Sequence, residues 1–450
     1  MGEGGLDDRL RSAVRTGDAE AVRDLLGKGA DPDALDADGL PVLCVAVAAY
    51  DEPVASVLVE GGSDPDLSLP DGTTPLWRAI DGGSAAVFSS VLGREPRLRI
   101  PEPDRERLLA FARSRYETGA AEELRRRTGA TGPATTVRVQ DDEYDWVEQV
   151  SLGGLVVRAG HGAVLTSLEW AFRVLPPVDE LVARAVAQPD GEHVDWSTVR
   201  WILAQRRSFE TWSAVVAHRH RADPKNRRFV LDYLRTRGFI ETDPHHVKRD
   251  SDLLAAWAAE ETDAEMLAMV LDVYTEHDHP DQEAIGLRHA DHPDPRVRRE
   301  VPYALCPEGT SSTPEARAAL LALMRDDPDS LVRLRACTAS MRDDGLLPEV
   351  VRALLLLAED ADPDLRGSAA VQLAASSDRT PAVADALVAL LDEDNQLVRL
   401  EAAYGLALRD DPRTAGAIER VGPLGPGFEH DHRASGLWWW EWRKANPDGE

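Results

Sequence analysis

A short phrase that recurs four times between residues 291 and 411 constrains the fold more than any other feature of this sequence. It reads Asp-Pro-Arg-Val-Arg, Asp-Ser-Leu-Val-Arg, Asp-Pro-Asp-Leu-Arg and Asn-Gln-Leu-Val-Arg. The arginines that end these phrases are 35, 33 and 33 residues apart: Arg298, Arg333, Arg366 and Arg399. A fixed period of this size indicates stacked supersecondary units rather than one closed globule.

Each unit of this period is expected to be a pair of helices. The first helix begins near a proline, as at 314–324, 348–357 and 381–391, and it ends at an acidic turn. The second helix carries apolar residues three and four apart, such as Val398, Ala402 and Leu406, on one face. A single pair cannot bury that face alone, so neighbouring pairs must stack. We predict that the four arginines form a structural ladder, each reaching the acidic turn of its own or the adjacent repeat.

The pattern resembles HEAT repeats, specifically the short form named after phycobilisome lyases. This resemblance implies an α/α solenoid, and for most proteins of this kind it implies an adaptor or scaffold. The family name itself would imply bilin attachment, and nothing in the motif selects between these roles.

A second period, of 33 residues, runs through the first 130 residues. It aligns Leu10, Leu43, Leu76 and Leu109. The stretch 74–79, Thr-Pro-Leu-Trp-Arg-Ala, resembles the ankyrin motif Thr-Pro-Leu-His-x-Ala, with Trp77 in place of histidine. The resemblance implies protein binding through the loop tips and the concave helix face. Our candidate contacts here are Leu35, Asp36, Asp38, Leu69, Asp71 and Trp77. The alternative is an acidic edge that is merely solvated.

The predicted fold class is therefore all-α: an α/α solenoid of ankyrin followed by HEAT-like repeats, with a small β insertion between them. We expect five segments: an ankyrin domain at 1–130, a short β-hairpin connector at 131–164, a degenerate HEAT-like region at 165–280, a HEAT domain at 281–420 and a Trp-rich cap at 421–450. Alternation at 136–140 and a Gly-Gly pair at 153–154 indicate the strands. His161, between two glycines, is expected in a turn. Four tryptophans are expected to form the core of the degenerate region: Trp170, Trp196, Trp201 and Trp212.

Charge is distributed unevenly along the chain. The formal net charge is −29, yet residues 200–249 hold 12 Lys or Arg and five Asp or Glu. Candidate contacts in this basic strip are Arg219, Arg221, Arg227 and Arg228. The strip could dock an acidic protein, neutralise an acidic surface of the same chain or bind nucleic acid. The acidic remainder of the chain argues against nucleic acid.

The best metal-like cluster contains four histidines: His277, His279, His289 and His292. Histidines one residue apart beside carboxylates can chelate zinc or manganese. Pro280 and Pro293, however, mark these segments as turns between helices, which favours a structural role. We therefore expect no metal or other cofactor, and the sequence has no Gly-rich phosphate loop, nucleophile elbow or Cys-His pair that would indicate an enzyme.

Four of the 11 tryptophans lie within residues 438–442. They can form a cap that seals the end of the repeat stack, or they can anchor a partner. Trp438 and Trp442 share a helical face. For the binding alternative we name Trp439 and Trp440 as contacts.

Three scattered cysteines and the lack of a leader or an 18-residue apolar run indicate a cytoplasmic protein that does not enter membranes. The residue usage, rich in Ala, Arg, Asp and Gly, indicates a bacterial source. We predict a non-catalytic scaffold or adaptor for an unidentified protein partner, and a neutraliser of a basic partner is one such role. The alternative is a HEAT-like enzyme or enzyme subunit, lyase-like or DNA glycosylase-like, that uses the basic strip.

Overall fold

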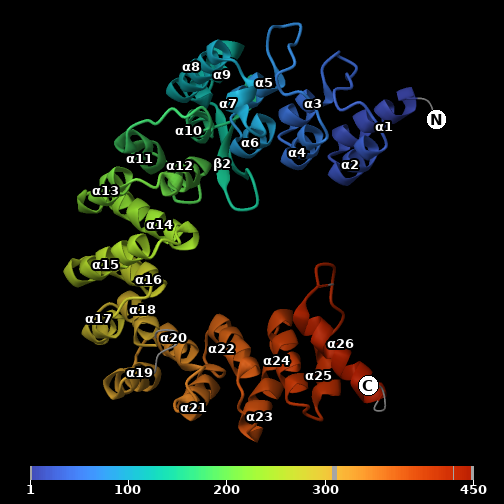
Figure 1. The fold of residues 1–450 in the computed structure, drawn as a ribbon. Helices are drawn as coiled ribbons and strands as arrows, with labels where there is room; N and C mark the ends of the chain where they lie inside the picture. The colour runs from blue at the N-terminus through green and yellow to red at the C-terminus, as the bar shows by residue number, and fades with distance from the viewer. Residues whose placement is uncertain (1–2, 307–311, 429, 447–450) are drawn as a thin grey trace. The chain divides into compact units, whose positions relative to one another are not determined.

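The computed structural model describes residues 3–306, 312–428 and 430–446, which form 26 α-helices, one 3-10 helix and one three-stranded sheet. The chain divides into two compact units, residues 1–240 and residues 241–450. The first unit, whose helices and strand β2 are labelled in Figure 1, contains the following elements: α1 Glu3–Thr16, α2 Ala19–Gly27, α3 Val42–Ala49, α4 Glu52–Glu60, α5 Pro75–Gly82, α6 Ala85–Leu92, α7 Pro96–Arg99, α8 Glu102–Thr118, α9 Ala120–Thr128, β1 Thr135–Gln140, β2 Trp146–Leu152, β3 Leu155–Arg158, α10 His161–Ala171, α11 Val178–Val186, α12 Val194–Gln205, α13 Phe209–Ala217, η1 His218–His220 and α14 Pro224–Ile240.

Helices α1 to α6 form three antiparallel pairs that pack side by side, with a long loop before each of the last two pairs (Figure 1). The leucines of the 33-residue period, Leu10, Leu43 and Leu76, are fully buried where these pairs meet. The Thr-Pro start of α5 explains its boundary: the Thr74 hydroxyl accepts the Trp77 N–H at 3.1 Å, and proline occupies a position that needs no donor. The local sequence and the packing therefore define the same unit.

The β insertion is a three-stranded antiparallel meander, one strand more than a hairpin. Gly153 and Gly154 form the turn between β2 and β3, with φ of 59° and 82°. Leu124 of α9 packs with Val150 and Val157 on one face of the sheet. The meander is thus attached to α9 by its own small core.

The prediction of a turn at His161 was wrong, because this residue begins α10 and is buried. Its Nε2 lies 3.3 Å from the Asp81 carbonyl oxygen, and burial lowers the pKa of His161 to about 4. The flanking glycines serve close packing: a Cβ on Gly160 would lie 2.7 Å from the Gly83 carbonyl oxygen, and one on Gly162 would lie 2.4 Å from Asp195 Oδ2.

Tryptophans of the region 165–280 are not all in the core. Trp196 is buried, and its indole N–H donates to Asp232 at 3.0 Å. Trp201 is 50% exposed, so its predicted core role was wrong. The two lie five residues apart on α12, which places them on different faces of the helix. Trp170 and Trp212 are half-buried.

The second unit contains 12 helices within its described residues: α15 Pro244–Glu260, α16 Ala264–Thr275, α17 Gln282–His289, α18 Pro295–Leu305, α19 Pro314–Asp326, α20 Ser330–Ser340, α21 Leu347–Leu357, α22 Pro363–Ala375, α23 Pro381–Leu390, α24 Gln396–Leu408, α25 Thr414–Val421 and α26 His432–Ala445. The even-numbered helices α16 to α26 pack one on the next, and α17, α19, α21 and α23 each pack on the helix that follows (Figure 1). This arrangement is an α/α solenoid, as predicted.

The residue before each repeated second helix is an N-cap. Asp294, Asp329, Asp362 and Asn395 each accept a main-chain N–H from the first turn of α18, α20, α22 or α24. One contiguous apolar core runs from Val301 to Trp440 beneath these helices. The recurring phrase is therefore a helix start whose cap, apolar face and arginine each have a structural role.

Candidate protein-interaction surfaces

The four repeated arginines make closely related contacts along the HEAT-like stack. Each donates to a main-chain carbonyl six residues earlier, in the acidic turn of its own repeat: His292, Asp327, Asp360 or Glu393. Arg298 also forms a bidentate pair with Asp327 of the next repeat, at 2.7 and 2.9 Å. Arg366 does the same with Glu393, at 2.6 and 2.9 Å. These contacts join consecutive turns and leave the guanidinium groups little capacity for a ligand.

The ankyrin loops are linked to one another by side-chain contacts. The Asp64 N–H donates to Asp33 Oδ1 at 2.9 Å, and the Ser63 hydroxyl donates to the Pro32 carbonyl at 2.6 Å. Arg11 donates to the Leu35 carbonyl at 2.6 Å. The loops that begin near residues 31 and 63 are therefore held in a fixed spacing, although the motif histidine is missing.

Several predicted loop contacts have structural functions. Asp36 Oδ1 accepts the main-chain N–H groups of Asp38 and Leu40. Asp71 accepts from Thr73 and Arg78, and these hydrogen bonds lower its pKa. Leu69 is buried, so it is not a surface contact. Leu35, which is 49% exposed, Asp38 and Asp71 are the exposed residues of this set, and Asp71 is paired with Arg78.

Trp77 lies against the neighbouring helix rather than at a loop tip. Its ring stacks on Phe111 of α8 with 3.8 Å between ring centroids, and the Arg115 guanidinium lies 4.6 Å from the Phe111 centroid on the same helix. Trp77 is half-buried. It therefore acts as packing between the third helix pair and α8.

The basic strip is divided between the two units, since residues 200–240 belong to the first and 241–249 to the second. Arg221 and Arg228 are exposed, whereas Arg219 and Arg227 are half-buried. Arg219 donates to the Val216 carbonyl, and Lys225 donates to the Gln188 carbonyl at 2.7 Å. Part of the strip thus stabilises its own unit.

The four candidate histidines are distributed over separate contacts. His279 lies between Tyr274 and Asp252, at 3.1 and 3.3 Å. His289 and His292 have ring centroids 6.3 Å apart, and His277 is buried. Over residues 3–306, 312–428 and 430–446 no group of three or more His, Cys, Asp or Glu side chains converges on a point that could hold a metal ion.

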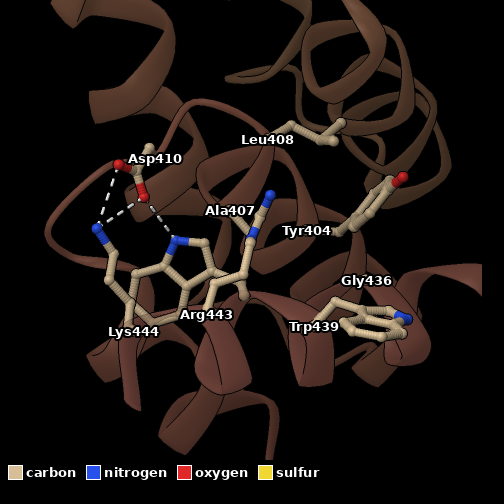
Figure 2. Close-up of a pocket in the computed structure, with 9 residues that line it drawn as sticks. Tyr404, Ala407, Leu408, Asp410, Gly436, Trp439, Arg443 and Lys444 are labelled. Atoms are coloured by element: carbon tan, nitrogen blue, oxygen red, sulfur yellow. Dashed lines mark hydrogen bonds and ion pairs between the residues drawn. The ribbon is translucent and has the colours of Figure 1, made fainter. Parts of the chain in front are cut away.

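A groove of about 760 Å³ lies between α24 and α26, lined by Tyr404, Ala407, Leu408, Asp410, Gly436, Trp439, Trp440, Arg443 and Lys444 (Figure 2). Its floor is fixed by Trp440, which is buried and donates its indole N–H to Asp410 at 3.0 Å. Lys444 pairs with the same carboxylate at 2.9 Å. Hydrogen bonds from Lys444 and Trp440 lower the pKa of Asp410. Trp440, named as a partner contact, is therefore a core residue.

The other tryptophans of α26 face solvent. Trp438, Trp439 and Trp442 are 56%, 52% and 37% exposed. Trp439 contacts both of the others edge-to-face, with centroids 4.9 and 5.5 Å apart. In α26, Leu437 and Trp440 therefore lie in the core, whereas the indoles of Trp438, Trp439 and Trp442 are exposed.

Two basic residues of the HEAT-like stack, Arg409 and Arg443, were not singled out from the sequence. Arg409 is half-buried and donates to the carbonyls of Leu373, Ala374 and Ser376, so it fastens the end of α24 to the end of α22. Burial lowers the pKa of Arg409 to about 10. Arg443 lines the groove, and among the described residues it has neither a hydrogen bond nor an ion pair of its own. The only available signal for either was a basic residue beside an aromatic or apolar run.

Comparison with known proteins assigns the two repeat types. Residues 10–99 match the family model for ankyrin repeats in three copies, and residues 251–341 match the model for HEAT repeats. The chain thus carries N-terminal ankyrin repeats and C-terminal HEAT repeats, as predicted. The HEAT match begins within the segment 165–280. Ankyrin and HEAT repeats are protein-interaction modules, and proteins built from them are typically non-catalytic scaffolds.

Individual relatives add little beyond the repeats. The mouse (Mus musculus) inactive serine/threonine-protein kinase TEX14 is 30% identical over 95 residues, which are 21% of this chain and 7% of that protein. The crystal structure of YibA from Escherichia coli is 17% identical and covers 55% of this chain and 93% of that one, at a TM-score of 0.40. A likeness at that level carries no argument about fold or function. In the described part of the chain, every helix is too short or too polar to cross a bilayer.

Proposed function

We propose that this chain is a non-catalytic cytoplasmic scaffold whose ankyrin loops capture a basic protein partner. The observation that carries the proposal is that hydrogen bonds join neighbouring ankyrin loops: Asp33 accepts the Asp64 N–H, and Ser63 donates to the Pro32 carbonyl. Loops already held in place lose little conformational entropy when a partner binds. The exposed carboxylates on them therefore form a preorganised acidic surface.

Charge supports a basic partner over other kinds. The exposed carboxylates of Asp31, Asp38, Asp64 and Asp71 lie on these loops, and the whole chain has a net charge of −29. A field of this sign speeds association with a positively charged protein and opposes nucleic acid and anionic membranes. A neutraliser of a basic partner is the specific role that we favour.

The proposal is tested with the variant Asp31→Asn/Asp38→Asn/Asp64→Asn. Asparagine keeps the side-chain oxygen that accepts the Asp33 and Asp66 N–H groups, so the loops retain their turns. The matched control, Glu359→Gln/Asp364→Asn/Glu419→Gln, removes the same charge from exposed positions of the HEAT repeats. Both are compared with wild type in affinity capture from the native lysate at about 0.15 M salt.

We expect one basic protein to be retained by wild type and by the control variant and to be lost by the loop variant. Its retention should also fall as salt rises. If no protein is retained, or if the loop variant retains the same protein as well as the control does, the proposal is wrong.

A further inference from the structure

The groove between α24 and α26 has a charge opposite to that of the chain as a whole. Asp410 is its one carboxylate among the lining residues, and this carboxylate already receives the Trp440 indole N–H and the Lys444 ammonium. Arg443 extends between the Asp410–Lys444 pair on one side and Tyr404 and Trp439 on the other (Figure 2). With Asp410 matched to Lys444, the positive charge of Arg443 is uncompensated among the lining residues.

The rest of the lining is apolar or aromatic. Leu408 and Trp439 are 47% and 52% exposed, and the Tyr404 ring lies across the groove from Trp439 (Figure 2). Gly436 opens this space, because a Cβ there would lie 2.5 Å from Tyr404 Cε2. Tyrosine, tryptophan and arginine, which line this groove together as Tyr404, Trp439 and Arg443, are the residue types enriched at interface hot spots.

The apolar surface continues beyond the groove along α26. Trp438 and Trp442 contact Trp439 and are exposed on the face of the helix opposite Leu437 and Trp440, which pack into the core. Contiguous exposed apolar side chains rimmed by polar ones mark interaction sites on soluble proteins. The position of this patch also explains why more tryptophans occur in α26 than the core requires.

We propose that this groove binds a peptide segment of a partner protein that carries a carboxylate next to an aromatic or large aliphatic side chain. The carboxylate accepts two hydrogen bonds from the Arg443 guanidinium, and the apolar side chain lies between Trp439, Tyr404 and Leu408. A basic segment is disfavoured, because Arg443 and Lys444 would both repel it. This site is distinct from the ankyrin loops and selects ligands of the opposite charge.

The test is a selection of random 12-residue peptides displayed on phage, carried out against the full chain. Peptides are counter-selected against the variant Trp439→Ala/Arg443→Gln, so that only ligands of the groove are enriched. Affinity of the enriched peptides is then measured by fluorescence anisotropy with a fluorescein-labelled synthetic copy. The matched control is Trp201→Ala, which removes a tryptophan of similar exposure from α12, outside both the groove lining and the tryptophan patch of α26.

We expect the enriched peptides to contain Asp or Glu beside Trp, Phe, Leu or Ile. Trp439→Ala and Arg443→Gln should each weaken binding at least tenfold, and Arg443→Lys should restore only part of the loss, since lysine cannot form the bidentate pair. Trp201→Ala should change affinity less than threefold. The loop variant Asp31→Asn/Asp38→Asn/Asp64→Asn should bind the peptides like wild type, which separates this inference from the proposed function.

Three results would overturn the inference. The first is enrichment of basic or uncharged peptides. The second is a failure to enrich any peptide over the counter-selecting variant. The third is self-association of the chain in sedimentation velocity that Trp439→Ala abolishes, which would assign the patch to a second copy. Circular dichroism of each variant verifies that α26 stays helical.

Discussion

Gly83 is the position where the structure predicts the sharpest response to a single added methyl group. The residue follows α5 with φ of 70°, and its carbonyl accepts the Gly160 N–H at 3.0 Å. A Cβ at this position would lie 2.0 Å from the Arg158 carbonyl oxygen and 2.6 Å from His161 Cε1. The Gly83→Ala substitution therefore tests the seam at which the ankyrin helices meet the sheet and α10.

Gly83→Ala changes the stability of the folded state through two destabilising effects and one stabilising effect. A left-handed backbone costs alanine about 1–2 kcal/mol. A close contact with a main-chain oxygen cannot be relieved by rotating a side chain, and such overpacking costs about 1–3 kcal/mol. Alanine also lowers the entropy of the unfolded chain, which returns about 0.5–1 kcal/mol. We expect a net loss of about 2–4 kcal/mol.

The matched control is Gly72→Ala. Gly72 has φ of 78°, and a Cβ there would meet nothing within 4 Å. This substitution carries the backbone penalty without the steric one, so we expect a loss of at most about 1 kcal/mol.

Local hydrogen exchange is the appropriate assay, because a chain of two compact units has no single unfolding free energy. Amides of α5, α6 and β3 should exchange about 30- to 1,000-fold faster in Gly83→Ala than in wild type, and no more than about fivefold faster in Gly72→Ala. Equal acceleration in the two variants would show that the close contact with Arg158 and His161 is not what requires glycine at position 83.

Three further predictions concern other parts of the molecule. Asp195 is buried, accepts from the Ala163 N–H and from Gln188 Nε2, and has a pKa raised to about 6 by burial, against an ordinary value of 3.8. The folded state therefore holds this proton more tightly than the unfolded state, and stability falls as pH rises from about 4 to 6. The stability difference between wild type and Asp195→Asn, measured by hydrogen exchange of the α10 and α12 amides, should shift by about 3 kcal/mol across that window, and a constant difference would contradict the raised pKa of Asp195. Arg298→Ala should destabilise the α18–α20 region by about 1–3 kcal/mol in hydrogen exchange, because the buried Asp327 carboxylate loses its ion pair. Arg352→Ala, on the exposed face of α21, should leave the hydrogen exchange of α21 unchanged. Trp77→Ala should lower the stability of α5 and α8, measured by hydrogen exchange, by about 2–3 kcal/mol through loss of the Phe111 stack. Trp201→Ala, at a 50% exposed position, should have little effect on α5 and α8, and equal effects would show that the stack contributes nothing.

The repeat architecture could be predicted from the sequence because periodicity is a local signal. Leucines 33 residues apart must lie at equivalent positions of consecutive helix pairs, whatever lies between them. The strands on either side of Gly153 and Gly154 could be predicted for the same reason, because a turn with two consecutive positive φ angles favours glycine at both positions.

Side-chain burial within a helix was harder to predict, because it depends on the face of the helix that a residue occupies more than on the residue type. Trp196 and Trp201 are five residues apart on α12, and one is buried while the other is exposed. In α26 the pair Leu437 and Trp440, three apart, lies in the core, whereas the pair Trp438 and Trp442 faces out. A tryptophan count alone could not choose between these faces.

The groove could not be predicted from the sequence, because its walls belong to two helices. Tyr404 and Trp439 are 35 residues apart in the sequence, and their approach depends on the absence of a side chain at Gly436. Asp410 adopts φ of 50° just after α24, which aims its carboxylate at Trp440 and Lys444. Such long-range geometry leaves no pattern within a short stretch of residues.

The acceptors of the repeated arginines have a consequence for how the HEAT-like stack tolerates change. Because each guanidinium is received by main-chain oxygens of the preceding turn, the side chains displayed on that turn do not decide whether the bond forms. Residues as different as His292 and Glu393 occupy the same position of the turn. The side chains of these turns could therefore be substituted without loss of the hydrogen bonds from the arginines to the main chain. Lysine in the arginine position would lack the planar guanidinium that contacts a carbonyl and a neighbouring carboxylate together. The turn residues can therefore vary only as long as this arginine is kept.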